Sequence, residues 1–201
     1  MRFDLQVIAS WIEPEAKVLD LGCRTGTLLT YLTQEKSIKG TGIEIDEVAA
    51  GEAISKGLSV IHGDIYEEIE DYPDNVFDYV ILSQTLQQVY DPEKLIREML
   101  RVGKRCIVTF PNFTHLKNRF QMFFTGRAPV SKELPYEWFN TPNIRVIPII
   151  DFRRFCAGLN IPIVREVGLL THHHDTKGRV IRFLPNLLAT FGVFMLGQAE
   201  E

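Results

Sequence analysis

Cysteine is scarce in this sequence, and long apolar runs and a basic block are missing. Cys23, Cys106 and Cys156 are far apart, form no Cys-x-x-Cys pair and stand beside apolar residues, which predicts three reduced, mostly buried thiols. No stretch approaches the roughly 18 apolar residues of a membrane span. The N-terminal MRFDLQVIASWIEPE carries Asp4 early and lacks the apolar centre of a signal peptide. These absences predict a soluble, cytoplasmic protein without a membrane partner.

The charge balance carries no signature of a nucleic-acid surface. Lys and Arg number 22 against 26 Asp and Glu, which gives a formal net charge of −4. Binding to nucleic acid needs concentrated positive charge, so no nucleic-acid partner is expected. The apolar share of 45% and the length of 201 residues are those of one large globular domain, expected to span 1–201.

Short apolar runs alternate regularly with segments of helical period. Parallel strands are predicted at 17–22, 40–46, 58–64, 75–84 and 104–112. The helix that begins at Asp91-Pro92 has an N-cap followed by proline at the first helical position. This alternation predicts a doubly wound α/β fold. After a helix at 151–160, two closing strands at 161–170 and 189–198 predict a hairpin-like, antiparallel finish.

The turn-like string THHHDTKGR, between the last two predicted strands, holds three consecutive histidines at 172–174. Neighbouring side chains point apart in an extended loop, and no second cluster of ligands stands elsewhere in the sequence. A solvated loop is therefore the favoured interpretation, and a metal site is the alternative.

Acidic and small polar residues collect where the predicted strands end. In an open parallel sheet, ligands bind outside the carboxyl ends of the strands. The residues there are Asp20, Gly22 and Gly26 after the first strand, Glu44 and Asp46 after the second, Asp64 after the third, and Ser83, Gln84 and Thr85 after the fourth. The first turn reads Asp-x-Gly-x-x-x-Gly, which is neither the dinucleotide fingerprint nor a P-loop.

The positions of these acidic residues indicate a ligand that consists of a nucleoside joined to an amino acid. Glu44 is placed to accept from both hydroxyls of a ribose. Asp20 suits an ammonium group better than a phosphate, and Asp64 can accept from the exocyclic amine of adenine. Together they describe S-adenosylmethionine. Each has a structural alternative: Asp20 as a turn cap, Glu44 as an exposed helix-start acid beside an Asp46 N-cap, and Asp64 as part of an ordinary turn.

The motifs VLDLGCRTG, GIEID and GDI resemble those of class I S-adenosylmethionine-dependent methyltransferases. Further strings resemble one family more closely, that of the methionine biosynthesis protein MetW: RFDLQVIASWI, VILSQTLQQV, REMLRVGKRCIVTFPNF, LPYEWFNTPNI and RFLPNLL. They extend from residue 2 to about 188. The resemblance implies a seven-stranded, mostly parallel Rossmann-like sheet with an antiparallel closing strand.

The same resemblance implies a pocket for S-adenosylmethionine or S-adenosylhomocysteine. Its residues would be Asp20, Gly22, Cys23, Arg24 and Gly26 around the methionine end, Glu44 with Ile45 at the ribose, Asp64 with Ile65 near the adenine, and Ser83, Gln84 and Thr85 toward the sulfonium. In some bacteria, members of the family are associated with homoserine O-acyltransferase in the methionine pathway. The resemblance therefore also implies that acyltransferase as a partner.

Arg24 departs from the family, which usually carries glycine at this position. If the position needs positive φ, a non-glycine residue costs roughly 1–2 kcal/mol, or about 5- to 30-fold in affinity. If the backbone touches the cofactor there, the β-carbon intrudes. A guanidinium that swings out to solvent, or pairs with the cofactor's carboxylate, would leave the loop open. The sequence alone does not decide between these outcomes.

Two functions stay open at this stage, because no methyl acceptor can be identified. Some N-methyltransferases carry Asn/Asp-Pro-Pro-aromatic after the fourth strand, but SQTL stands here, so methylation of a nucleic-acid base is not expected. His115 is interpreted as a structural residue at a helix start. One hypothesis is a methyltransferase acting on a small molecule. The other is a non-catalytic, S-adenosylmethionine-sensing partner of homoserine O-acyltransferase.

The segment 111–143 is rich in aromatic and basic residues. Its aromatic residues are Phe113, Phe120, Phe123, Phe124, Tyr136, Trp138 and Phe139, and they are interleaved with Lys117, Arg119, Arg127 and Lys132. One interpretation is a helix and loop packed over the sheet. The others are a lid over the acceptor site, a docking surface for another protein, or both.

Overall fold

A single eight-stranded sheet forms the centre of the molecule, in the order β3-β2-β1-β4-β5-β8-β6-β7. The computed structural model describes residues 1–172 and 174–198. The parallel strands are β1 (Lys17–Leu21), β2 (Lys39–Glu44), β3 (Ser59–His62), β4 (Phe77–Ser83) and β5 (Gly103–Pro111). The antiparallel part consists of β6 (Ile163–Leu170), β7 (Arg179–Ile181) and β8 (Phe191–Gly197). The predicted α/β class, with an antiparallel finish, is confirmed.

The number of strands differs from the predicted seven, because the chain forms an additional short strand. β7 pairs through three residues with the end of β6, within a segment whose composition indicates only a turn. A strand of three mostly exposed residues leaves no apolar run to detect. β8 also inserts between β5 and β6, so the last strand of the chain lies inside the sheet and not at its edge.

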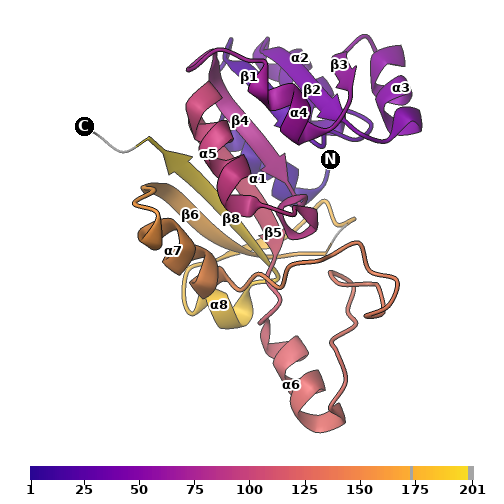
Figure 1. Ribbon diagram of the computed structural model, residues 1–201. Helices are drawn as coiled ribbons and strands as arrows, with labels where there is room; N and C mark the ends of the chain where they lie inside the picture. The colour runs from indigo at the N-terminus through magenta and orange to yellow at the C-terminus, as the bar shows by residue number, and fades with distance from the viewer. Residues whose placement is uncertain (173, 199–201) are drawn as a thin grey trace.

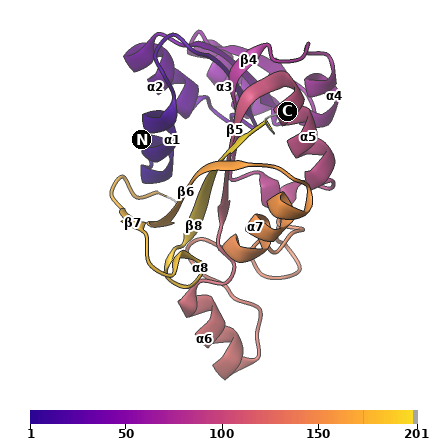
Figure 2. The same ribbon diagram turned by 90° about the vertical axis from the view of Figure 1, so that its left-hand side faces the viewer.

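Helices cover both faces of this sheet (Figures 1 and 2). The helices of the described chain are α1 (Phe3–Trp11), α2 (Thr27–Lys36), α3 (Glu47–Ser55), α4 (Ile65–Glu70), η1 (Leu86–Gln88), α5 (Pro92–Val102), α6 (Leu116–Thr125), α7 (Ile149–Gly158) and α8 (Pro185–Leu188), of which α6 projects away from the sheet. One core cluster joins α4, α5 and α7 to the sheet, and a second joins α1 and α2 to its other face. Strand β4 contributes side chains to both core clusters. Val80 and Leu82 belong to the first cluster, and Tyr79 and Ile81 belong to the second.

Two predicted N-caps fix where the helices α3 and α5 begin. The Asp46 carboxylate accepts a 2.9 Å hydrogen bond from the Ala49 amide at the start of α3. Asp91 accepts from the Lys94 amide at 3.0 Å, with Pro92 at the first position of α5. Each cap satisfies an amide that has no partner inside its helix, so these helices begin where the sequence predicts.

Candidate cofactor-binding site

The strand order reverses between β1 and β4, which places a topological switch point at the middle of the sheet. β1 pairs with β2 on one side and with β4 on the other, all parallel, so their carboxyl ends share one edge. The loop after β1 folds over the end of β2, because the Gly22 and Cys23 amides both donate to the Ile43 carbonyl, at 2.8 and 3.1 Å. This is the place in such a sheet where ligands bind.

Glu44, the last residue of β2, is held by backbone amides from two sides. One carboxylate oxygen accepts from the Arg24 amide at 2.7 Å, and the other accepts from the Asp46 amide at 2.9 Å. The side chain is buried, so it is not the exposed helix-start acid that the sequence left open. A carboxylate has about four acceptor positions, and these bonds use two of them. Two positions remain for hydroxyl groups.

Asp20, on β1, is a buried carboxylate without a hydrogen-bond donor among the residues that the structure describes, and only 3% of it is exposed. Burial raises its pKa from 3.8 to about 7, and the nearby Glu44 carboxylate adds to the rise, while Arg2 acts in the opposite direction. Buried polar groups are nearly always satisfied, so a group without a donor needs an explanation. Asp20 does not cap the turn, and its carboxylate accepts no hydrogen bond in the described part of the chain.

The two glycines of the loop are required by close packing inside the protein. Both have positive φ, +71° at Gly22 and +72° at Gly26. A β-carbon at Gly22 would lie 2.9 Å from the Thr85 hydroxyl oxygen, and one at Gly26 would lie 2.2 Å from a methyl group of Leu58. Gly22 therefore lets the loop lie against the end of β4, and Gly26 lets α2 begin against Leu58.

Cys23 is buried between the loop and β2. Its sulfur lies so close to Gly42 that a β-carbon there would be 2.5 Å away. Burial raises the pKa of this thiol to about 12, and the Asp20 and Glu44 carboxylates add to the rise. The thiol is therefore neither a nucleophile nor a metal ligand at neutral pH.

Arg24 adopts the left-handed conformation that the family's usual glycine suggests, with φ of +51°. Its amide donates to Glu44, and its side chain is exposed, without a hydrogen bond or ion pair in the described part of the chain. Because the conformation is present in the free protein, its strain of roughly 1–2 kcal/mol belongs to folding and not to binding. The guanidinium pointing to solvent is thus the outcome observed, and the expected loss of affinity does not follow.

We therefore expect Arg24→Gly to leave the affinity for S-adenosylmethionine within about 3-fold of the original. Relief of the left-handed strain is offset by the greater freedom of glycine in the unfolded chain, so stability should change by about 1 kcal/mol or less. Calorimetric titration and thermal unfolding of both proteins test this. A change in affinity of more than tenfold would show that the Arg24 side chain takes part in binding.

The end of β4 is tied to the start of α1 by a chain of polar contacts. Gln84 has a φ of +56°, and its amide donates to both oxygens of Thr109, at 3.0 and 3.1 Å. Its side-chain nitrogen donates to Asp4 at 2.5 Å, and Asp4 is paired with Arg2 at 2.9 Å. Asp4 is buried, so these contacts fix the start of α1 against the end of β4, near Asp20.

Arg2 and Asp4 are the residues of this site that the sequence did not reveal as functional. The contact joins residues 80 positions apart, and no local pattern marks it. Ser83 and Thr85 are engaged within the protein: the Ser83 hydroxyl lies 3.4 Å from that of Thr109, and Thr85 donates to the Ser83 carbonyl at 3.2 Å.

Asp64 and its neighbours lie at the end of β3, next to the end of β2. The Gly63 amide donates to the Glu44 carbonyl at 3.1 Å, which joins the two strand ends. Asp64 is the N-cap of α4, and one carboxylate oxygen accepts from the Tyr66 amide at 2.8 Å. Ile65 packs against the core, and Ile45 is 66% exposed at the rim. The acid is thus a helix cap, and its second oxygen accepts no hydrogen bond in the described part of the chain, which leaves it available to an amine.

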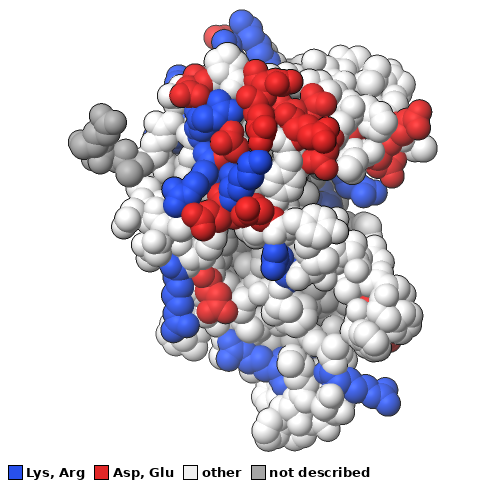
Figure 3. Space-filling view, in the orientation of Figure 1, with Lys and Arg blue, Asp and Glu red and all other residues white. Residues whose placement is uncertain are grey.

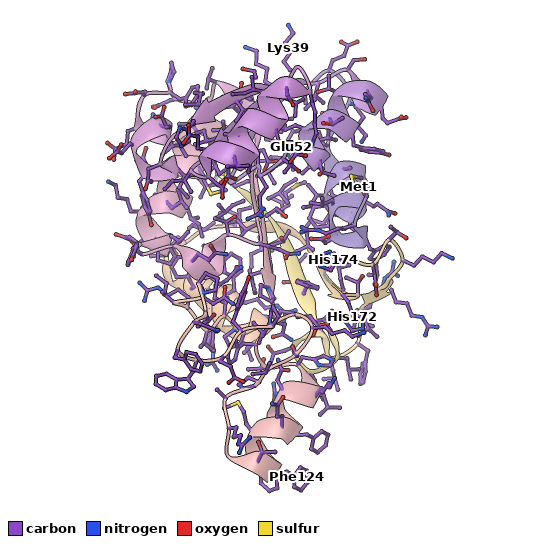
Figure 4. The ribbon with its side chains drawn as sticks, turned by 90° about the vertical axis from the view of Figure 1, so that its right-hand side faces the viewer. Met1, Lys39, Glu52, Phe124, His172 and His174 are labelled. Carbon is purple, nitrogen blue, oxygen red and sulfur yellow. The ribbon has the colours of Figure 1, made fainter. Side chains whose placement is uncertain are left out.

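The histidine loop lies on the side of the molecule toward which the parallel strands run. Figure 4 places His172 and His174 between Met1, which precedes α1, and Phe124, on α6. The imidazole of His172 is hydrogen-bonded to Glu133 of the aromatic segment, so this loop is not merely solvated. His173 lies outside the described residues. In the described ranges, no group of three or more His, Cys, Asp or Glu side chains is arranged to hold a metal ion.

Comparison with known proteins decides the family. A model of the methionine biosynthesis protein MetW family matches residues 2–196. The chain belongs to the MetW family. A bifunctional methionine biosynthesis protein MetXA/MetW from Rhodopirellula baltica is 35% identical over 176 residues. Those residues are 83% of this MetW chain but 28% of that relative. A demethylmenaquinone methyltransferase from Staphylococcus epidermidis is 29% identical over 180 residues, which cover 77% of this chain and 72% of that protein.

Solved structures place this MetW chain in the class I methyltransferase fold. An S-adenosylmethionine-dependent methyltransferase from Thermotoga maritima superposes with a TM-score of 0.71 at 21% identity, over 98% of this chain and 88% of that one. A magnesium protoporphyrin IX methyltransferase from Synechocystis, with bound S-adenosylhomocysteine, gives a TM-score of 0.65 at 16% identity, over 98% and 82%. Among the helices described for this chain, none has the length and apolarity that crossing a membrane requires.

Proposed function

We propose that this protein binds S-adenosylmethionine or S-adenosylhomocysteine in the cleft at the carboxyl edge and acts as a methyltransferase-like protein of methionine biosynthesis. The observation that carries the proposal is the pair of buried acids. Asp20 lacks a donor and suits the ammonium of the methionine moiety, and Glu44 keeps two acceptor positions for the ribose hydroxyls. Asp64 lies at the next strand end, on the adenine side.

The residues around the cleft favour positioning over proton transfer. The bound cofactor would supply an electrophilic methyl group, and the chain would align it and exclude water. An acceptor of high pKa needs a general base as well. The nearby polar side chains are engaged: Asp4 pairs with Arg2, Asn112 donates to backbone carbonyls, and His115 caps α6. This arrangement suits an acceptor that is nucleophilic without help from a base.

Calorimetric titration of the purified protein with S-adenosylmethionine, and separately with S-adenosylhomocysteine, tests the cofactor assignment. We expect dissociation constants in the micromolar range. Absence of binding at millimolar cofactor would overturn the proposal. A screen of small-molecule acceptors for formation of S-adenosylhomocysteine then tests methyl transfer, and a screen without turnover would count against catalysis while leaving cofactor binding intact.

A second function is favoured by the relative that combines MetXA and MetW in one polypeptide. We propose that the protein also acts as a cofactor-sensing partner of homoserine O-acyltransferase. Joining two units in one chain raises their effective concentration to about the millimolar range, which is useful where the units act together. Co-elution of the two purified proteins, with a change in acyltransferase rate, is the expected result. If neither effect occurs, the partner role is wrong.

A further inference from the structure

Helix α6 projects from the body and exposes aromatic rings to solvent. Asn118 is its one buried residue, whereas Phe120 is 52% exposed, Phe123 82% and Phe124 74%. Figures 1 and 2 show the helix outside both helical layers, and Figure 4 places Phe124 at the opposite end of the molecule from Glu52 on α3. The interpretation of a helix packed over the sheet is therefore wrong for α6.

Exposed rings stand in two groups, one on α6 and one in the loop that follows. Phe124 stacks on Phe120 at 5.9 Å between ring centres and meets Phe123 edge-on at 5.0 Å. In the following loop, Trp138 and Phe139 are 77% and 69% exposed and lie 5.8 Å apart. Between helix and loop lies a cavity of about 520 Å³, lined by Gln121, Gly126, Arg127, Ala128, Val130, Glu137 and Trp138. We call residues 116–139 the aromatic hook.

The aromatic hook lies away from the carboxyl edge in this structure. The chain returns toward the end of β4 only after the hook, where the Ile144 and Arg145 amides both donate to the carbonyl of Gln87 in η1, at 2.9 and 3.0 Å. The guanidinium of Arg145 also donates to the carbonyls of Val89 and Tyr90. The stretch around 144–147 thus lies beside the end of β4, while the hook points away from it. Exposed aromatic side chains together with arginine are residue types typical of a protein interface.

The charge of the hook restricts what it can bind. The aromatic hook contains four basic residues, Lys117, Arg119, Arg127 and Lys132, against two acids, Glu133 and Glu137, so it is net basic although the whole chain has a net charge of −4. Figure 3 shows acidic side chains gathered around α4 and α5, and Lys and Arg at the projecting end. In a symmetric dimer that joins hook to hook, these cations would face one another, which is unfavourable. The complementary partner surface is apolar with an acidic rim.

We propose that the aromatic hook is the surface by which this protein binds homoserine O-acyltransferase. This proposal rests on the second proposed function, the partner role, and names the surface that would make the contact. In the relative from Rhodopirellula baltica, the region like this chain occupies 28% of the polypeptide, so a MetXA unit accompanies it there. The cavity, with polar Gln121 and Glu137 in its wall, accepts a protruding side chain of a protein better than the flat surface of a bilayer.

The test uses the full chain and the purified homoserine O-acyltransferase of the same organism. The double variant Phe123→Ser, Phe124→Ser removes two exposed rings, and Arg127→Glu reverses a charge at the cavity. Val48→Ser is the matched control, since Val48 is 81% exposed on α3 at the far end. By biolayer interferometry we expect at least 30-fold weaker binding for the double variant, about tenfold weaker binding for Arg127→Glu, and no change for the control.

The outcomes separate this inference from the functions on which it rests. All variants should keep the wild-type affinity for S-adenosylmethionine, because no substituted residue lines the cleft. If the wild type binds the acyltransferase and the hook variants bind it equally well, the assigned surface is wrong and the partner role stands. If the wild type does not bind it, the partner role falls together with the surface. A concentration-dependent dimer, or binding to anionic vesicles, that only the hook variants lose would also overturn the proposal.

Discussion

Asp20→Asn is expected to stabilise the free protein at pH 8 and to weaken binding of S-adenosylmethionine by about 100-fold. In the free protein, the Asp20 carboxylate is buried without a donor, and its pKa is raised to about 7. An uncharged amide removes the unfavourable buried charge, which is worth at most about 4 kcal/mol for a rise of about three pKa units. The same change removes the anion that would receive the ammonium group.

The sign of the pH dependence follows from this raised pKa. Between pH 4 and 7 the folded protein holds a proton on Asp20 that the unfolded chain has lost, so stability falls as pH rises through that window. Affinity for the cofactor should rise as pH increases toward 7, by up to tenfold per pH unit, because the ionised carboxylate is the form expected to bind the ammonium group. Both dependences should disappear in Asp20→Asn.

Chemical denaturation and calorimetric titration at pH 6 and pH 8 measure the two effects on the same samples. Asp91→Asn is the matched control, because asparagine caps a helix as well as aspartate and Asp91 lies at the start of α5. If Asp20→Asn binds the cofactor as tightly as the wild type, the ammonium assignment is wrong. If it is destabilised at pH 8, Asp20 has a structural partner in solution.

Glu44→Ala is expected to abolish measurable binding, with a loss of affinity greater than 100-fold. The substitution removes the acceptor for the ribose and also releases the Arg24 and Asp46 amides, which the carboxylate holds at 2.7 and 2.9 Å. Hydrogen bonds to a charged group contribute about 1.5–3 kcal/mol each, so the protein should also be destabilised, and its glycine loop should lose its fixed position.

Glu47→Ala is the comparison for this variant, since Glu47 is exposed in the first turn of α3 and has no hydrogen bond or ion pair with the described residues of the loop. Titration with S-adenosylhomocysteine and thermal unfolding are the measurements. Affinity retained within about 3-fold in Glu44→Ala would show that the ribose is held elsewhere. Loss of affinity in Glu47→Ala as well would indicate a general effect of charge near α3 and not a specific contact.

In the proposed site, these two acids would be in position before any ligand binds. Glu44 is fixed by backbone donors before any ligand arrives, so little ordering is needed on binding. Asp20 is kept in an unfavourable environment, which a cation would relieve. Burial that destabilises the free state and favours the bound state is a common reason for a site to be less stable than its surroundings.

The sequence by itself determined the features that depend on near neighbours. The five parallel strands, the caps Asp46 and Asp91, and the acids at the strand ends follow from apolar runs and from hydrogen bonds that span about four residues. The motif resemblance added the family, which comparison confirmed. Positive φ at Arg24 was also a sequence-based possibility, because it depends on the backbone of a single residue.

Only the tertiary structure decided the features that join distant parts of the chain. The Arg2–Asp4–Gln84 contact, the insertion of β8 between β5 and β6, and the projection of α6 all depend on segments tens of residues apart. The missing donor at Asp20 and the direction of the Arg24 side chain are of the same kind. A sequence displays which groups can interact, whereas packing alone determines which of them are left without a partner.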